Sequence, residues 1–177
     1  MRRVRLEWKF CPFPGDSNMD SSTHEAFLRR AVALSLQSVE SGEGGPFGAV
    51  IVKDGKIVGE GRNRVVGNND PTAHAEVMAI RAACHALSAF HLEGCVLYTS
   101  CEPCPMCLAA AYWARIERIY YANTRGDAAS IGFCDADLYC ELARPGEERQ
   151  LPMEHLPLAD ALEPFRRWLA NPNRISY

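Results

Sequence analysis

A short pattern of metal-binding residue types constrains this chain more than any other feature. His74 and Glu76 are followed further along the chain by Pro103-Cys104-Pro105-Met106-Cys107. One imidazole and two thiolates suit a tetrahedral zinc ion with a fourth position open for water, which a structural site would normally close with a fourth protein ligand. The fold must therefore bring two distant segments together, with Glu76 placed to move protons to and from the bound water.

Spacing alone leaves the choice of thiolate ligands open. Cys101, Cys104 and Cys107 form two overlapping Cys-x-x-Cys pairs, a pattern that indicates metal binding in an intracellular protein. The structural alternative is a zinc-ribbon clip in which Glu76 is only an acid at a helix N-terminus. A ribbon needs a fourth ligand that this spacing does not offer, so a catalytic zinc site is the favoured prediction.

Length and charge are those of one soluble domain. A chain of 177 residues can bury a substantial core without disulfides. The net charge of −3 gives no overall attraction to nucleic acid. No apolar run approaches membrane-spanning length, and no apolar signal-peptide core follows the basic residues 2–5. We therefore expect a cytoplasmic protein without membrane or nucleic-acid partners.

Apolar periodicity and turn residues predict a mixed α/β fold. We expect a helix capped by Ser22 or Thr23, and then a β-hairpin around Asp54-Gly55. Further helices are expected over 73–87, 104–113 and 158–169 and near residues 128 and 138, with strands over 96–99 and 118–122. This order implies a central mixed sheet covered by helices on both faces. Residues 1–22 are expected to form a flexible extension, and residues 23–177 a single domain.

Longer motifs carry a resemblance to a known family. The segments 45–55, 69–76 and 98–107 resemble those of bacterial guanine deaminases, a branch of the zinc-dependent cytidine-deaminase-like superfamily. The likeness continues through 112–115 and 132–135 to the last residue. It implies a three-layer α/β/α sandwich with one zinc ion per subunit, which carries a bound water and lies between two helix N-termini. It also implies that His74, Cys104 and Cys107 are the zinc ligands, with Cys101 as a neighbour.

The resemblance further implies a purine-binding site. It gives Glu76 the role of proton shuttle and places Asp135 beside the exocyclic amine of the substrate, although Cys134 stands where the family commonly has an acidic residue. The implied substrate-binding residues are Phe47, Asn63, Ala73, Pro103, Trp113 and Tyr177. Structural alternatives remain for several of them: core packing for the aromatic residues 47 and 113, a turn for residue 63, and loop capping for residue 135.

The expected reaction is hydrolytic deamination of guanine to xanthine and ammonia. Guanosine deamination, or deamination of triazines or cytosine, is the nearer alternative. Editing of adenosine in tRNA is more distant, because the chain is acidic and has no long basic stripe. A non-catalytic zinc module would not need Glu76. The resemblance also implies a homodimer in which residues 157–177 cross to the partner subunit and Tyr177 covers the partner's active site.

Overall fold

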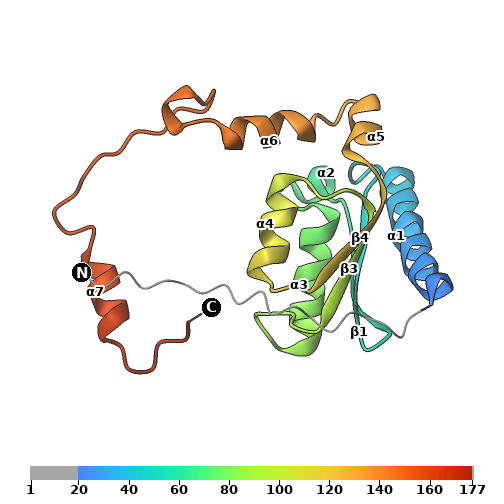
Figure 1. The fold of residues 1–177 in the computed structure, drawn as a ribbon, viewed down its shortest axis with the longest axis horizontal. Helices are drawn as coiled ribbons and strands as arrows, with labels where there is room; N and C mark the ends of the chain where they lie inside the picture. Colours follow the sequence, from blue (N-terminus) through green and yellow to red (C-terminus); the bar gives the residue numbers. More distant parts are fainter. Residues whose placement is uncertain (1–19, 177) are drawn as a thin grey trace.

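The computed structural model describes residues 20–176, which form a mixed sheet with helices on both faces and a long C-terminal extension (Figure 1). The elements are α1 (Ser21–Ser41), β1 (Gly48–Lys53), β2 (Lys56–Arg62), α2 (Val65–Asn68), α3 (Ala75–Leu87), β3 (Cys95–Cys101), α4 (Pro105–Trp113), β4 (Arg118–Asn123), α5 (Arg125–Ser130), α6 (Asp135–Ala143), the 3-10 helix η1 (Gly146–Glu148) and α7 (Glu163–Ala170). The predicted fold class is confirmed.

The sheet has the strand order β2-β1-β3-β4. Strand β1 runs antiparallel to both β2 and β3, whereas β3 and β4 are parallel and are joined through α4. The predicted hairpin between β1 and β2 turns at Asp54 and Gly55, whose φ angles of 48° and 71° are both left-handed. A two-residue turn of this kind matches the twist of the strands that it joins.

Alternating residues of the central strands face the two helical layers. Val50 and Tyr98 pack with Leu34 of α1 on one face of the sheet. Ala49 and Leu97 belong to the other core cluster, which also contains residues from α3 and α4. Strand β3 is buried along its whole length. This double cover explains why β3 is apolar on both faces instead of alternating with polar residues.

Close packing of α3 on β2 sets the depth of the metal-binding segment. A Cβ atom on Gly61 of β2 would lie 2.2 Å from the carbonyl oxygen of Ala75, so only glycine permits this approach. Ala75 is the first residue of α3 and directly follows His74. The contact between β2 and α3 therefore fixes where the imidazole enters the site.

Two predicted helix starts are wrong. The first helix is capped by Asp20, whose Oδ1 accepts a hydrogen bond from the backbone N–H of Thr23 at 2.9 Å, and not by Ser22 or Thr23. The last helix begins at Glu163 instead of residue 158. Pro164 lies in its first turn, where a backbone N–H would have no partner within the helix, so proline is tolerated there. The larger part of the predicted extension 1–22 lies outside the described residues. None of the helices in 20–176 is long and apolar enough to cross a membrane.

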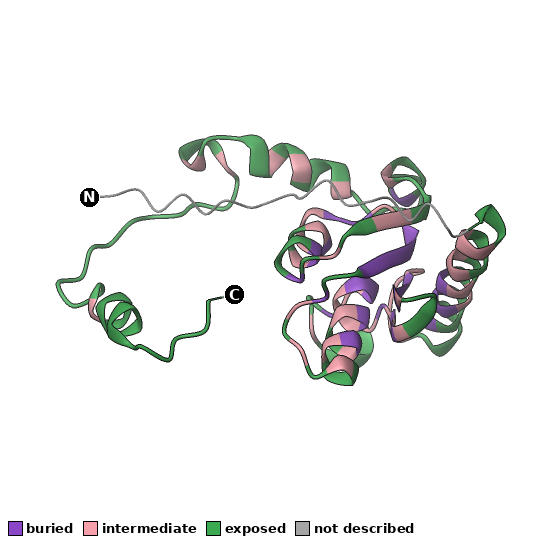
Figure 2. Cartoon of the chain, turned by 60° about the horizontal axis from the view of Figure 1, so that its bottom comes forward, coloured by how far each residue is buried: buried purple, intermediate pink, exposed green. Residues whose placement is uncertain are grey.

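Beyond α6 the chain leaves the sheet and its helices. Residues 144–176, here called the C-terminal arm, run away from the body in both views (Figures 1 and 2). Most of the arm is exposed along its length, including the whole segment 151–162 (Figure 2). The helix α7 and the end of the described chain therefore lie apart from the domain that contains the sheet.

Candidate active site

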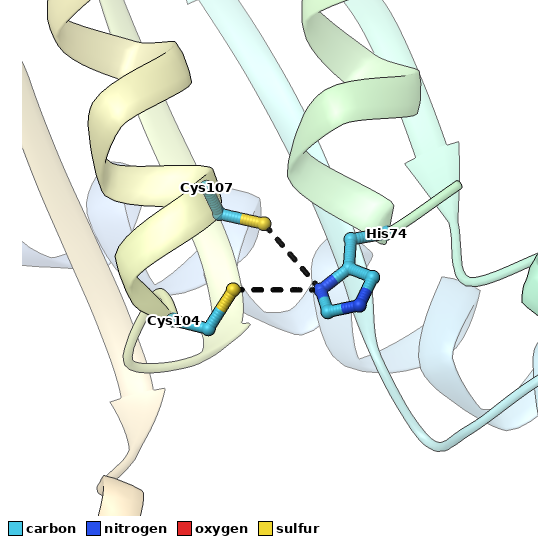
Figure 3. A group of neighbouring side chains, drawn as sticks. All are labelled: His74, Cys104 and Cys107. Atoms are coloured by element: carbon cyan, nitrogen blue, oxygen red, sulfur yellow. Dashed lines mark hydrogen bonds between the residues drawn. The ribbon is translucent and has the colours of Figure 1, made fainter. Parts of the chain in front are cut away.

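Two helix N-termini meet at the predicted zinc ligands (Figure 3). His74 is the N-cap residue of α3, and Cys104 is the N-cap residue of α4, both with extended backbone angles. Cys107 follows in the first turn of α4. The positive ends of the two helix dipoles therefore point at the same small volume, which stabilises thiolate and carboxylate groups there.

The three side chains have the spacing that a tetrahedral metal ion requires. The Sγ atoms of Cys104 and Cys107 each lie 3.6 Å from Nδ1 of His74, and all three ligand atoms lie within 4.8 Å of one another. Zn–S and Zn–N bonds of about 2.3 and 2.0–2.1 Å at a tetrahedral angle give an S–N separation of about 3.6 Å. The residues therefore fit zinc.

Cys101 is not part of this group. It is the last residue of β3, it is buried, and its Sγ lies 3.5 Å from the carbonyl oxygen of Thr124. Burial raises the pKa of the Cys101 thiol to about 11, so this sulfur stays protonated at neutral pH. The geometry selects the pair Cys104 and Cys107 from the overlapping Cys-x-x-Cys patterns.

The two ligand thiols share a proton when no metal neutralises them. A hydrogen bond from Cys107 and a weaker one with His74 together lower the pKa of Cys104 to about 4. The same hydrogen bond, with burial, raises the pKa of Cys107. The pair then carries one negative charge. Binding of zinc requires both thiolates and so releases the remaining proton.

Glu76 is a buried acid beside the metal ligands. It is the second residue of α3 and only 6% exposed, and burial raises the pKa of its carboxyl group. A carboxyl group with a raised pKa can both take and give a proton near neutral pH. Glu76 also lines the cavity in front of the metal ligands, so that proton can reach a bound molecule.

A cavity of about 280 Å³ opens in front of these groups. This is close to the lower end of the roughly 300–1,000 Å³ typical of small-molecule sites. The size suits a single nucleobase. The lining residues are Gly45, Phe47, Asn63, Val65, Val66, Pro71, His74, Glu76, Glu102, Cys104, Phe133 and Asp135.

Asn63 is held in one orientation at the cavity wall. Its Oδ1 accepts hydrogen bonds from the backbone N–H groups of Gly45 and Val65, at 3.3 and 3.2 Å. The side chain is 3% exposed. Because Oδ1 faces the backbone, the Nδ2 amine is the end of the amide that can donate to a ligand. The turn alternative and the binding role of Asn63 are therefore compatible.

Phe47 and Asp135 also line the cavity. The ring of Phe47 meets that of Phe133 edge to face, with centroids 4.8 Å apart, and both rings line the cavity. Asp135 enters from the first turn of α6, and burial raises the pKa of its carboxyl group. Six lining residues were not predicted as site residues, among them Glu102, directly before the predicted Pro103, and Phe133, two positions before Asp135.

The other implied substrate-binding residues that the structure describes do not line the cavity. Ala73 and Pro103 are buried, and their carbonyl oxygens accept hydrogen bonds at 2.9 Å from the backbone N–H of Arg64 and from the hydroxyl of Tyr139. Trp113 is 60% exposed at the far end of α4, about 14 Å along the helix axis from Cys104. Tyr177 lies outside the described residues.

Comparisons with known proteins match this geometry. The family model described as the cytidine and deoxycytidylate deaminase zinc-binding region matches residues 21–123. Guanine deaminase of Bacillus subtilis is 54% identical over 154 residues, which are 87% of this chain and 99% of that protein. The X-ray structure of guanine deaminase from B. subtilis matches with a TM-score of 0.85 and 53% identity, over 90% of this chain and 99% of the other. A tRNA-specific adenosine deaminase of Aquifex aeolicus is 37% identical over 78% of this chain and 89% of its own length.

Proposed function

This chain belongs to the zinc-binding cytidine and deoxycytidylate deaminase family, and we propose that it deaminates guanine hydrolytically to xanthine and ammonia. The observation that carries the choice of guanine is the 54% identity to a guanine deaminase over nearly the whole length of that protein. The cavity supports the choice of guanine, because Asn63 and Asp135 line it together with two of the metal ligands.

The cavity offers each edge of guanine a complementary group. Guanine has acceptors at O6 and N7 and a 2-amino donor on the opposite edge. The amide NH2 of Asn63 can donate a hydrogen bond to the acceptor edge, while the carboxylate of Asp135 accepts one from the 2-amino group. Phe47 and Phe133 supply the apolar walls that a flat ring requires.

The chain's own residues then move the protons of the reaction. His74, Cys104 and Cys107 would hold one zinc ion per subunit, and zinc bound there would lower the pKa of a water molecule to roughly 7. Glu76 takes a proton from the attacking water and gives it to the ring nitrogen beside C2. The water oxygen bonds to C2, and the second proton of that water passes through Glu76 to the amine. The bond from C2 to the amine then breaks as the bond from C2 to the oxygen becomes a carbonyl. Asp135 stabilises the departing amine, which leaves as ammonia.

The charge of the cavity disfavours a phosphate-bearing substrate. Three carboxylates, those of Glu76, Glu102 and Asp135, line the cavity together with Cys104. Among the described residues, no lysine or arginine lines the cavity to pair with a phosphate group. This supports a free base over a nucleotide or a tRNA. The cytoplasmic location and a role in purine metabolism remain predictions.

Ammonia release from a panel of compounds tests the proposed function. The zinc-loaded protein is incubated with guanine, guanosine, adenine, cytosine and ammeline, and separately with a tRNA as a macromolecular substrate. We expect guanine to be turned over fastest, with xanthine as the product. Faster turnover of guanosine would move the assignment to the nucleoside, and turnover of tRNA alone would remove it.

We also propose that the protein is a homodimer that exchanges its C-terminal arm. Folded monomers rarely expose large contiguous apolar patches, yet the arm carries exposed apolar side chains throughout. These are Leu151, Met153, Leu156, Leu158, Leu162, Phe165, Leu169 and Ile175, each at least 55% exposed. Packing of the arm on a second subunit would bury them. It would also bring Tyr177, which follows the arm, to the partner's cavity.

Sedimentation velocity tests the exchange. The full chain should sediment as a dimer, and the double variant Phe165→Glu, Leu169→Glu should sediment as a monomer. A matched variant that changes charges on the polar side of the same helix, Arg166→Glu, should remain dimeric. A monomeric full chain would contradict the exchange.

A further inference from the structure

We propose that Arg125 and Tyr139 form a clamp that positions Asp135 for the reaction, by fixing α6 against the loop that carries Cys104. This inference rests on the proposed function, because Asp135 is its target. Neither residue lines the cavity. Both are positioning residues, which act through a group that touches the substrate.

The first half of the clamp joins Glu102 to Arg125. Both carboxylate oxygens of Glu102 are engaged by this residue, Oε1 by the guanidinium group and Oε2 by the backbone N–H at 3.0 Å. Glu102 directly follows β3, and Arg125 is the first residue of α5. The side chain of Glu102 is 18% exposed, so this pair is shielded better than an ordinary surface ion pair. It ties the loop before α4 to the start of α5.

The second half joins Arg125 to the metal-binding loop through Tyr139. The guanidinium carbon of Arg125 lies 4.3 Å from the centroid of the Tyr139 ring. The hydroxyl of Tyr139 donates a hydrogen bond of 2.9 Å to the carbonyl oxygen of Pro103, which directly precedes Cys104. The contacts therefore form a closed circuit that starts at Glu102 and returns to the neighbouring Pro103.

The position of Tyr139 on α6 links this circuit of contacts to Asp135. Asp135 and Tyr139 stand four residues apart, so they lie on one face of the helix, one turn from each other. Within α6, Asp135, Tyr139 and Glu141 are half-buried and no residue is fully buried. Glu141 pairs with Arg144 and Gln150 of the C-terminal arm and not with the body. The rotation of α6 thus depends on Tyr139, and it sets the direction of the Asp135 carboxylate. Phe133 packs on Phe47 but precedes the helix, so it does not fix this rotation.

Two conservative variants test the clamp. Tyr139→Phe removes only the hydroxyl that reaches Pro103, and Arg125→Lys keeps the charge beside Glu102 but loses the flat group that stacks on the ring. We expect each to lower kcat/KM for guanine about tenfold, as the loss of one buried hydrogen bond or stacking contact would. Zinc content should stay at the wild-type level. The matched controls Tyr120→Phe and Arg29→Lys, which change a half-buried tyrosine on the α1 side and an exposed arginine, should retain wild-type kinetics.

A double-mutant cycle separates positioning from a general loss of structure. If the clamp acts through Asp135, Tyr139→Phe should lower activity much less in an Asp135→Asn background than in the wild type. Arg125→Lys supplies the same cycle should Tyr139→Phe fail to fold or to bind zinc. An undiminished effect in that background, or wild-type kinetics of both single variants, would overturn the clamp. Absence of guanine turnover in the wild type would instead remove the proposed function itself.

Discussion

Three carboxylates line the same cavity, but each has a different electrostatic environment. The guanidinium group of Arg125 lowers the pKa of Glu102, which therefore stays charged. Burial raises the pKa of both Glu76 and Asp135. Acids whose pKa values are pushed apart by their surroundings are suited to different roles. These directions support the proposed roles of Glu76 in proton transfer and of Asp135 beside the amine, whereas Glu102 is a fixed charge beside Arg125.

Replacement of Glu76 by glutamine should leave zinc bound and nearly abolish turnover. The ligands are untouched, whereas the loss of a positioned acid–base group costs about 10²–10⁴-fold in rate. The measurement is kcat for guanine in protein whose zinc content has been determined. Near-normal turnover in a zinc-replete Glu76→Gln protein would contradict the mechanism.

The choice of thiolate ligands can be tested by metal analysis alone. Cys104→Ser and Cys107→Ser should each lose zinc, because a serine hydroxyl is a poor substitute for a thiolate. Cys101→Ser is the matched control and should keep most of the zinc, since its sulfur contacts a backbone carbonyl of Thr124 instead. Loss of zinc from Cys101→Ser with retention in Cys107→Ser would reverse the assignment.

At the scale of elements, two contacts hold the sheet to its helical layers near the site. Helix α3 lies directly on β2 where Gly61 meets Ala75. On the opposite face, Arg30 of α1 reaches across to Glu60 of β2 with two hydrogen bonds of 2.7 and 2.6 Å. The first contact depends on the absence of a side chain, and the second depends on charge, so the two respond to different perturbations.

Gly61→Ala should destabilise the fold and reduce zinc affinity together. The added methyl group would have to displace the start of α3, and overpacking of this kind costs about 1–3 kcal/mol. Gly146→Ala is the control, because a Cβ there meets nothing within 4 Å. Urea unfolding and zinc titration measure both effects. Unchanged zinc affinity in a destabilised Gly61→Ala would separate packing from ligand placement.

The ion pair of Arg30 and Glu60 should make stability depend on acid pH. The hydrogen bond from Arg30 lowers the pKa of Glu60 below its usual value of 4.5. The stabilisation is therefore present above pH 4.5, and it is lost as the pH falls through the lower pKa of the folded protein. The side chains are 40% and 35% exposed, so the contribution is about 0.2–1 kcal/mol. Urea unfolding of wild type and Glu60→Gln should differ at pH 7 and converge in acid.

At the scale of the whole molecule, the chain divides into a compact domain that contains the cavity and an arm that leaves it (Figure 1). The cavity is built entirely from residues 45–135. The arm therefore contributes nothing to the cavity of its own chain among the described residues. The exposed apolar side chains of the arm support the proposed dimer, in which a second subunit would bury them and the arm would cover the partner's cavity.

Deletion of Tyr177 alone should leave a folded, zinc-loaded dimer with a clearly lower kcat/KM for guanine. A ring that covers the partner's cavity would exclude water and contact the bound purine, as closing elements do. Steady-state kinetics and sedimentation of the deletion variant measure activity and assembly separately. Full activity would reduce the end of the chain to a packing element.

The sequence by itself determined the chemistry of this protein. His74, Glu76 and the cysteines of the two overlapping Cys-x-x-Cys pairs indicate a metal site with an open position, because imidazole and thiolate groups are the ligands that zinc prefers. The order of helices and strands along the chain and the Asp54-Gly55 turn likewise predicted the layered fold. These signals are local, so they can be read along the chain.

Only the tertiary structure decided how these groups work together. Selection of Cys104 and Cys107 over Cys101 follows from distances to His74 across two helix N-termini. The contribution of Glu102 and the clamp through Arg125 and Tyr139 arises because the end of β3, the start of α5 and the middle of α6 lie beside one another. Contacts between residues far apart in sequence are set by packing, so no local pattern could have revealed them. The exposed arm was visible for the same reason: burial is a property of the folded chain.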